Sequence, residues 1–273
     1  MELGPAVNEW LQLLLRWFHV FAAILWIGST YFFTWLDGRL AEQERAPHHC
    51  GHPQVWMVHS GGFYVVEKQQ GVQMLPRELH WFRWEAALTW ISGMLLLAMV
   101  YYMGGLMVDA DVAKISDGEA IVISLGGIVA GWAVYDLLWD SPLGRAEMAA
   151  GGICFLLVAA ATYGLAQVFS GRAAYMQMGT MFGTIMAANV WMRILPAQRG
   201  MIASAKSGTP PDLALAARAK QRSKHNTFMV VPVVFIMISS HFPVATYGHK
   251  YNWAILVGLI LLGWVVARLI RRA

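Results

Sequence analysis

Long runs of apolar residues alternate along the chain with shorter polar segments. A helix that crosses the hydrocarbon layer needs roughly 20 mostly apolar residues, because the layer is about 30 Å thick and each helical residue rises about 1.5 Å. Seven runs are long enough, at residues 10–35, 79–103, 119–139, 147–169, 173–195, 225–243 and 251–270. The pattern predicts an all-α integral membrane protein, a bundle of about seven transmembrane helices that forms a single domain over residues 1–273.

The composition supports this prediction. Apolar residues make up 58% of the chain and charged residues only 13%, and the mean hydropathy is +0.49, whereas soluble domains carry about 25% charged residues. The segment before the first run has no Lys or Arg, so that run is not expected to be a cleaved signal peptide. The net charge of +4 is explained by loop topology, and no nucleic-acid partner is expected.

Lys and Arg are distributed unevenly between the two sets of loops. Counted by alternate side, fourteen fall on one side, in the segments 37–78 and 196–224, at Arg145 and at the C-terminal end, and three (Lys114, Arg172 and Lys250) fall on the other. Because cytoplasmic loops are rich in basic residues, we expect the N-terminus outside and the C-terminus in the cytoplasm. The sequence also predicts a solvated connector at 196–224. Within 37–78, the apolar run 55–66 is too short to span and is expected to lie at the interface or to re-enter the bundle.

His19 is the clearest candidate for chemistry inside a span. Ionisable residues are costly in hydrocarbon, so each one there is a functional-site hypothesis. Ala22, Ala23 and Trp26 follow His19 at helical spacing on the same face. Small neighbours leave room for a flat cofactor, and neutral imidazole is a common axial ligand of haem. The alternative is a histidine that is hydrogen-bonded to a neighbouring helix.

Two further histidines bracket the sixth run. Sixteen residues separate His225 from His241, which in a helix corresponds to roughly 160° and 24 Å, so the two cannot share one metal. His241, near the outer surface, could share a haem site with His19. His225 is expected at the cytoplasmic end, beside His80.

The sequence HWFRWEA at 80–86 places a histidine, a cation, a carboxylate and two indoles close together. A planar anion fits such a group: Arg83 would bind it, Trp84 would stack on it, and His80 or Glu85 would move protons. The alternative is an interfacial aromatic belt with snorkelling charges, which explains Glu85 poorly.

The remaining polar residues give weaker signals. The His48 to His52 cluster has metal-ligand residue types without a standard zinc spacing. Asp136 and Asp140 are expected to be solvated caps or counter-ions. Cys50 and Cys154 are not expected to pair, and the chain has no Cys-x-x-Cys-His attachment site for c-type haem, so any haem would be non-covalent.

These motifs resemble the membrane part of the bacterial membrane-bound urate hydroxylases (PuuD type). The resemblance runs from residue 15 to about residue 243. It is carried by LRWFHVFAAILWIGSTYFFTWLD at 15–37, VHSGGFY at 58–64, LHWFRWEA at 79–86 and RSKHNTFMVVPVVFIMISSHFP at 222–243. The first segment also resembles, more weakly, the first helix of membrane protoporphyrinogen oxidases, in which a histidine ligates haem b.

The resemblance implies oxidation of urate to 5-hydroxyisourate in the bacterial inner membrane, with water as the oxygen source and electrons leaving through cytochrome c instead of reducing dioxygen; the b-type haem that would pass them on is inferred from His19. The resemblance carries over His19, His59, His80, His225 and His241 as site residues and strengthens His19 as a haem-iron ligand. His241 is the expected second ligand from its depth in the membrane, and the resemblance does not fix the ligand pairs. Two features depart from the family. The covalent cytochrome c of the family is absent after Ala273, so a separate cytochrome c or a quinone is expected as electron acceptor. The family's His-Gly-Gly-Gly is His-Ser-Gly-Gly at 59–62.

Two alternatives remain open from the sequence. One is a haem b membrane oxidoreductase that acts on another substrate or on quinone. The other is a non-redox permease or sensor for an anion, in which the histidines would only bind the anion or relay protons.

Overall fold

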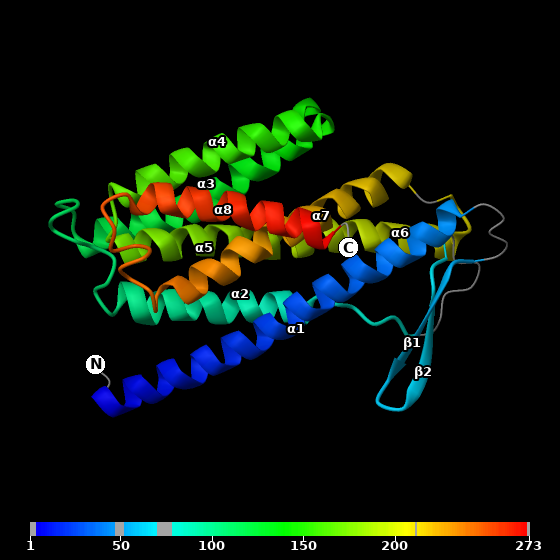
Figure 1. Cartoon of the computed structure of the whole chain (residues 1–273), viewed down its shortest axis with the longest axis horizontal. Coiled ribbons are helices and arrows are strands. Elements are labelled where there is room, and N and C mark those ends of the chain that lie inside the picture. Colours follow the sequence, from blue (N-terminus) through cyan, green and yellow to red (C-terminus); the bar gives the residue numbers. More distant parts are fainter. Residues whose placement is uncertain (1–3, 47–51, 70–77, 211, 272–273) are drawn as a thin grey trace.

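Antiparallel helices lie side by side in one elongated bundle, with a two-stranded hairpin at one end (Figure 1). The computed structural model describes residues 4–46, 52–69, 78–210 and 212–271. Within these ranges the elements are α1 (Pro5–Arg45), β1 (Gln54–His59), β2 (Gly62–Glu67), α2 (Trp84–Leu96), η1 (Leu97–Tyr102), α3 (Asp117–Asp140), η2 (Pro142–Arg145), α4 (Glu147–Ala166), α5 (Gly171–Ala188), η3 (Asn189–Ile194), α6 (Leu195–Ser207), α7 (Leu213–Ser239) and α8 (Asn252–Ile270).

The two π-helical segments, η1 and η3, continue α2 and join α5 to α6 without a break. Counting each continuous rod once, the described part of the chain has seven long helical rods, and each of the seven predicted runs overlaps one of them. The end of the bundle where α1 begins is called here the N-terminal end. The opposite end, where the hairpin lies, is called the hairpin end (Figure 1).

Five of the helices are long and apolar enough to cross a membrane: α1, α2 with η1, α3, α4 and α8. Helices α5 and α7 are less apolar and form the interior, where their side chains make up much of the buried core. A Cβ on Gly179 of α5 would lie 2.8 Å from Cγ2 of Ile236 on α7, so glycine is what allows this close approach. Interior helices face other helices and not lipid. Small residues that allow close packing are therefore more important for them than a high hydropathy.

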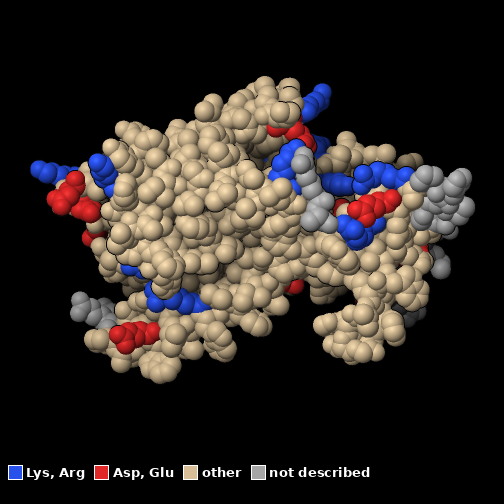
Figure 2. Space-filling model, in the orientation of Figure 1, with Lys and Arg blue, Asp and Glu red and all other residues tan. Residues whose placement is uncertain are grey.

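Charged side chains gather at the two ends of the molecule, and the surface between them is almost wholly uncharged (Figure 2). Large apolar side chains are exposed along this band, for example Trp17 (70% exposed), Leu137 (71%) and Leu156 (68%). Soluble monomers rarely expose apolar patches larger than a few hundred Å². The band is therefore the surface that a bilayer would cover.

Several predicted boundaries are wrong. Residues 196–224 are not a connector, because α6 continues to Ser207 and α7 begins at Leu213. Gly208, with φ of 68°, ends α6, and the Asp212 carboxylate accepts hydrogen bonds from the first amides of α7. A segment rich in charged residues can still form a helix when its polar face contacts water or another part of the protein. The second helix begins at Trp84, so His80 precedes it instead of opening it.

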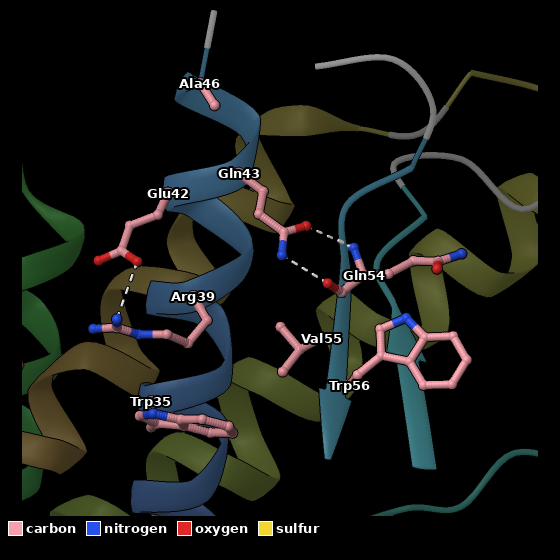
Figure 3. A pocket seen from close by; sticks show the side chains of 8 residues that line it. All are labelled: Trp35, Arg39, Glu42, Gln43, Ala46, Gln54, Val55 and Trp56. Carbon is pink, nitrogen blue, oxygen red and sulfur yellow. Dashed lines mark hydrogen bonds and ion pairs between the residues drawn. The ribbon is translucent and has the colours of Figure 1, made fainter. Parts of the chain in front are cut away.

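The run 55–66 forms a β-hairpin and does not re-enter the bundle (Figure 1). Val55 and Val66 pair across the hairpin and pack on Leu36 and Leu40 of α1. The Gln43 side chain bonds both backbone groups of Gln54, donating to its carbonyl at 2.7 Å and accepting from its amide at 2.9 Å (Figure 3). These contacts fix the hairpin against the last turns of α1. That the exposed apolar face of the hairpin lies at the membrane interface remains a prediction.

The hairpin turn gives a test of local stability. Ser60 and Gly61 both have positive φ, 49° and 77°, as a two-residue type I′ turn requires. Because a side chain is disfavoured there, Ser60→Gly is expected to stabilise the hairpin by roughly 0.5–1 kcal/mol, seen as slower amide exchange across β1 and β2. Gly61→Ala is the opposite control and should speed exchange. Equal exchange in both variants would contradict the turn geometry.

Candidate functional site

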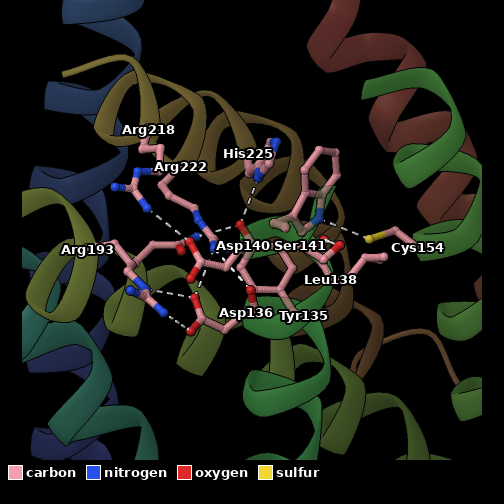
Figure 4. A network of polar contacts seen from close by, with 12 residues as sticks. Tyr135, Asp136, Leu138, Asp140, Ser141, Cys154, Arg193, Arg218, Arg222 and His225 are labelled. Carbon is pink, nitrogen blue, oxygen red and sulfur yellow. Dashed lines mark hydrogen bonds and ion pairs between the residues drawn. The ribbon is translucent and has the colours of Figure 1, made fainter. Parts of the chain in front are cut away.

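A buried network of polar side chains joins α3, η3 and α7 towards the hairpin end (Figure 4). Asp136 is its centre. Arg193 Nε donates to Asp136 Oδ1 at 2.9 Å and its Nη2 donates to Oδ2, while Arg222 Nη2 lies 3.0 Å from Asp136 Oδ1. The Arg222 side chain is only 4% exposed and that of Asp136 14%. Asp136 is thus a counter-ion, as predicted, but it is largely buried and not solvated.

Polar groups next to this ion cluster continue the network. Asn189 Nδ2 donates to Tyr135 Oη at 3.0 Å and to Asn226 Oδ1 at 2.9 Å. Tyr135 Oη lies 2.8 Å from His225 Nδ1, and Trp139 packs on the His225 ring with 4.1 Å between centroids. The network therefore places His225 against α3.

Two atoms of the network lack a partner in the described structure, Arg222 Nη1 and Asn189 Oδ1. Buried polar groups without a hydrogen bond are rare, so such atoms suggest a place for water or a ligand. Our reading of the sequence missed Asn189, Arg193 and Tyr135. The signal was available, since Asn189 and Arg193 are polar residues inside a predicted span.

A second group lies at the start of α2. The Arg83 guanidinium sits 5.6 Å from the ring centroids of both Trp81 and Trp84. Trp84 in turn contacts Trp191 of η3, with 5.8 Å between centroids. Among the residues described, no carboxylate lies within ion-pair distance of Arg83, and Glu85 Oε2 is buried without a hydrogen-bond partner. Arg83 is thus a cation between two indoles with capacity for an anion.

The other histidines predicted at this site lie apart. His80 is exposed and stacks edge-on against Phe82, with 4.5 Å between ring centroids. His59 ends β1 at the exposed hairpin turn, and His225 belongs to the buried network. In the described structure no hydrogen bond, ion pair or ring contact joins His80 to His225, and none joins His59 to Arg83. The structure therefore brings together Arg83 and Trp84, next to Glu85 in the sequence, and not the full predicted set.

His19 packs against α2. Its Nδ1 lies 3.0 Å from the Thr89 carbonyl oxygen and 3.0 Å from Ser92 Oγ. Since a carbonyl can only accept, Nδ1 must carry the hydrogen, which leaves Nε2 with a free lone pair. A Cβ on Gly93 would lie 3.0 Å from His19 Cε1, so the ring lies directly on the glycine. Metal-bound histidines usually have this arrangement, with the second nitrogen donating to a carbonyl.

The expected partner of His19 is not seen beside it. His241 is exposed, just beyond the end of α7, and no recorded contact joins it to His19. In the described ranges there is no group of three or more His, Cys, Asp or Glu side chains that could hold a metal ion. Residues 48–51 of the histidine cluster lie outside those ranges, and His52 is exposed.

Comparison with known proteins gives one match. A family model described as urate oxidase N-terminal matches residues 5–272, nearly the whole chain. No curated protein and no solved structure matches.

The ion cluster predicts a large difference between two aspartates of α3. Asp136→Asn leaves buried Arg222 without its counter-ion and is expected to cost about 3–5 kcal/mol in unfolding free energy. Asp140→Asn removes only the ion pair with Arg218, whose side chains are 41% and 59% exposed, and is expected to cost less than about 1 kcal/mol. Denaturant unfolding in detergent measures both. Similar losses in the two variants would contradict the central role of Asp136.

Proposed function

Because the chain belongs to the urate oxidase N-terminal family, we propose that it is a membrane-bound oxidoreductase of the PuuD type that converts urate to 5-hydroxyisourate. Water supplies the added oxygen. Each turnover consumes one urate and one water and releases one 5-hydroxyisourate, two protons and two electrons. The protein must therefore bind the purine, accept the protons that the reaction releases and pass the two electrons on.

The observation that carries the substrate assignment is Arg83, a cation held between Trp81 and Trp84 without a carboxylate partner in the described structure. Urate is a planar anion at neutral pH. A guanidinium binds such an anion through paired hydrogen bonds, and an indole can stack on its ring system. The N-terminus of α2 adds favourable potential, because the helix dipole is positive there.

Proton uptake falls to groups beside Arg83. Glu85 lies in the first turn of α2, and its Oε2 lacks a hydrogen-bond partner in the described structure, so it is free to accept a proton from urate or from the attacking water. His80 is exposed and can pass a proton to bulk water. We leave His59 and His225 out of the urate site, since neither contacts Arg83.

His19 would hold the iron of a b-type haem. Its Nε2 is free, its Nδ1 is held by the Thr89 carbonyl, and the neighbouring Gly93, Ala22 and Ala23 are small. A bound haem b would supply one-electron acceptance from the urate site. Arg83 at the urate site and Ser92 beside His19 are nine residues apart along the chain. Nine residues correspond to about 14 Å of helix rise, so along the axis of α2 the two sites are separated by about half the thickness of the hydrocarbon layer.

The direction of electron exit follows from the proposed topology. With the N-terminus outside the bacterial inner membrane, His19 faces the periplasmic half. The loop between η1 and α3 and the first turn of α3 on that side carry Asp109, Asp111, Asp117 and Glu119, with Lys114 as the lone basic residue of this segment. An acidic face attracts a basic protein. We therefore propose a separate cytochrome c as acceptor, with membrane quinone as the alternative.

A visible spectrum with urate tests the proposal. The purified protein is expected to show a Soret band, and urate added without oxygen is expected to reduce it. Arg83→Gln should weaken urate binding at least tenfold and leave the spectrum unchanged, because it removes a charge-assisted bond and not a haem ligand. Arg145→Gln, at an exposed arginine of the same end, is the matched control.

The outcomes separate the alternatives. A colourless folded protein would exclude the redox function and favour an anion permease or sensor. An intact haem that urate cannot reduce would leave an oxidoreductase of another substrate.

The exit route makes a separate prediction. Turnover with urate alone should be negligible and should be restored by added cytochrome c, with a rate that falls as ionic strength rises, because screening weakens the attraction of the acidic loop. The variant Asp109→Asn with Asp111→Asn should lower that rate several-fold at low salt only. Restoration by quinone alone, or rapid turnover with dioxygen, would reject cytochrome c as acceptor.

A further inference from the structure

Within the described residues, two arginines near the N-terminal end of the bundle form no ion pair. Arg16 lies within the apolar part of α1 and is exposed, and Arg172 is half-buried in the first turn of α5. None of the ion pairs in the described structure includes either residue. Arg172 Nε is moreover buried without a hydrogen-bond partner. A cation without a partner is costly in hydrocarbon, so an anion is expected here.

Tyr101 links the two arginines. The Arg172 guanidinium lies over its ring, 5.9 Å from the centroid, and Arg172 and, more weakly, Arg16 are close enough to act electrostatically on its phenol group. Tyr101 is only 4% exposed, yet its hydroxyl has no hydrogen-bond partner. It belongs to the π-helical segment η1, and such segments are frequent at functional sites. Donors from α1, η1 and α5 thus lie near the same end of the bundle, and in the described structure Arg172 Nε and the Tyr101 hydroxyl are buried without a hydrogen-bond partner.

The position of Arg16 relative to His19 identifies the anion. The two residues are three apart on α1, so they lie on the same face, one turn from each other, with Arg16 nearer the N-terminal end. A ligand that reaches His19 Nε2 can also reach Arg16. Such a ligand needs one group that accepts the free lone pair of the imidazole. One helical turn nearer the N-terminal end, it needs two anionic groups that pair with the two guanidinium groups.

From this arrangement we propose that Arg16, Tyr101 and Arg172 bind the two propionate carboxylates of the haem whose iron His19 ligates. The inference rests on the haem of the proposed function. Carboxylates match guanidinium groups in charge and in hydrogen-bond geometry. The ring then lies deeper in the apolar band and the carboxylates point toward the N-terminal end. A lipid phosphate offers the same charge, but the buried Tyr101 hydroxyl and Arg172 Nε favour a ligand inside the bundle.

Haem and its dimethyl ester, in which both carboxylates are blocked, distinguish these ligands. Full-length protein made in haem-deficient cells, in nanodiscs of phosphatidylcholine, is titrated with each and followed by the Soret band. Wild type is expected to bind haem at least tenfold more tightly than the ester. The variant Arg16→Gln with Arg172→Gln should bind both equally weakly, whereas Arg16→Lys with Arg172→Lys should keep most of the preference.

The midpoint potential gives a second readout that a structural role would not move. Each single Gln variant should shift the potential downward, because loss of a nearby positive charge favours the oxidised, more positive iron. Lys114→Gln, at an exposed cation of the same end, is the control and should leave both affinity and potential unchanged.

The failures are distinguishable. If wild type binds haem and ester equally and the variants match it, the propionate site is overturned and the haem of the proposed function stands. If added phosphatidylglycerol stabilises wild type but not the Gln variant, and haem and ester bind alike, the occupant is a lipid headgroup and the proposal is overturned. If no Soret band forms with either compound, the haem of the proposed function is itself rejected.

Discussion

The structure depends on the way in which two arginines share the single carboxylate of Asp136. A buried guanidinium such as that of Arg222 is tolerated only with a counter-ion and hydrogen bonds, and Asp136 is its counter-ion while also pairing with the partly exposed Arg193. These three residues come from η3, α3 and α7, so one carboxylate fixes the relative position of three helices near the hairpin end. The geometry of Tyr135, Asn189 and His225 follows from that arrangement, since each belongs to one of the same three elements.

Sequence patterns predicted the helices well and their ends poorly. Hydrophobic runs located every long helix, because burial in hydrocarbon or in a helix interior requires them. They could not locate α6, whose polar residues were read as a solvated loop, or the start of α2. Hydropathy reports what surrounds a segment and not its backbone hydrogen bonds. The hairpin was missed as a hairpin because its turn signal is only Ser60 followed by Gly61, in an apolar run that also suits an interfacial segment.

Residue type alone identified His19 and Arg83 as candidates for chemistry, whereas Asp136 was expected to be only a solvated cap or counter-ion. Residue type could not say which side chains meet. The predicted topology put His80 and His225 side by side at the cytoplasmic end, but His80 lies outside the helix and His225 faces α3. Partners such as Tyr135 for His225, or Thr89 for His19, depend on how two helices are rotated against each other. Single-sequence periodicity does not contain that information when a helix is apolar on every side.

One helix carries features of both ends of the molecule. Helix α1 runs without interruption from Pro5 to Arg45, and the hairpin is fixed to it at Leu36, Leu40 and Gln43. His19 and Leu40 are 21 residues apart, about 32 Å along the axis. Helix α1 packs chiefly on α2 and leaves most of its surface uncovered. A protein or lipid that displaces the hairpin would therefore tilt α1 as one rigid helix. The tilt would change the contact between His19 and Thr89.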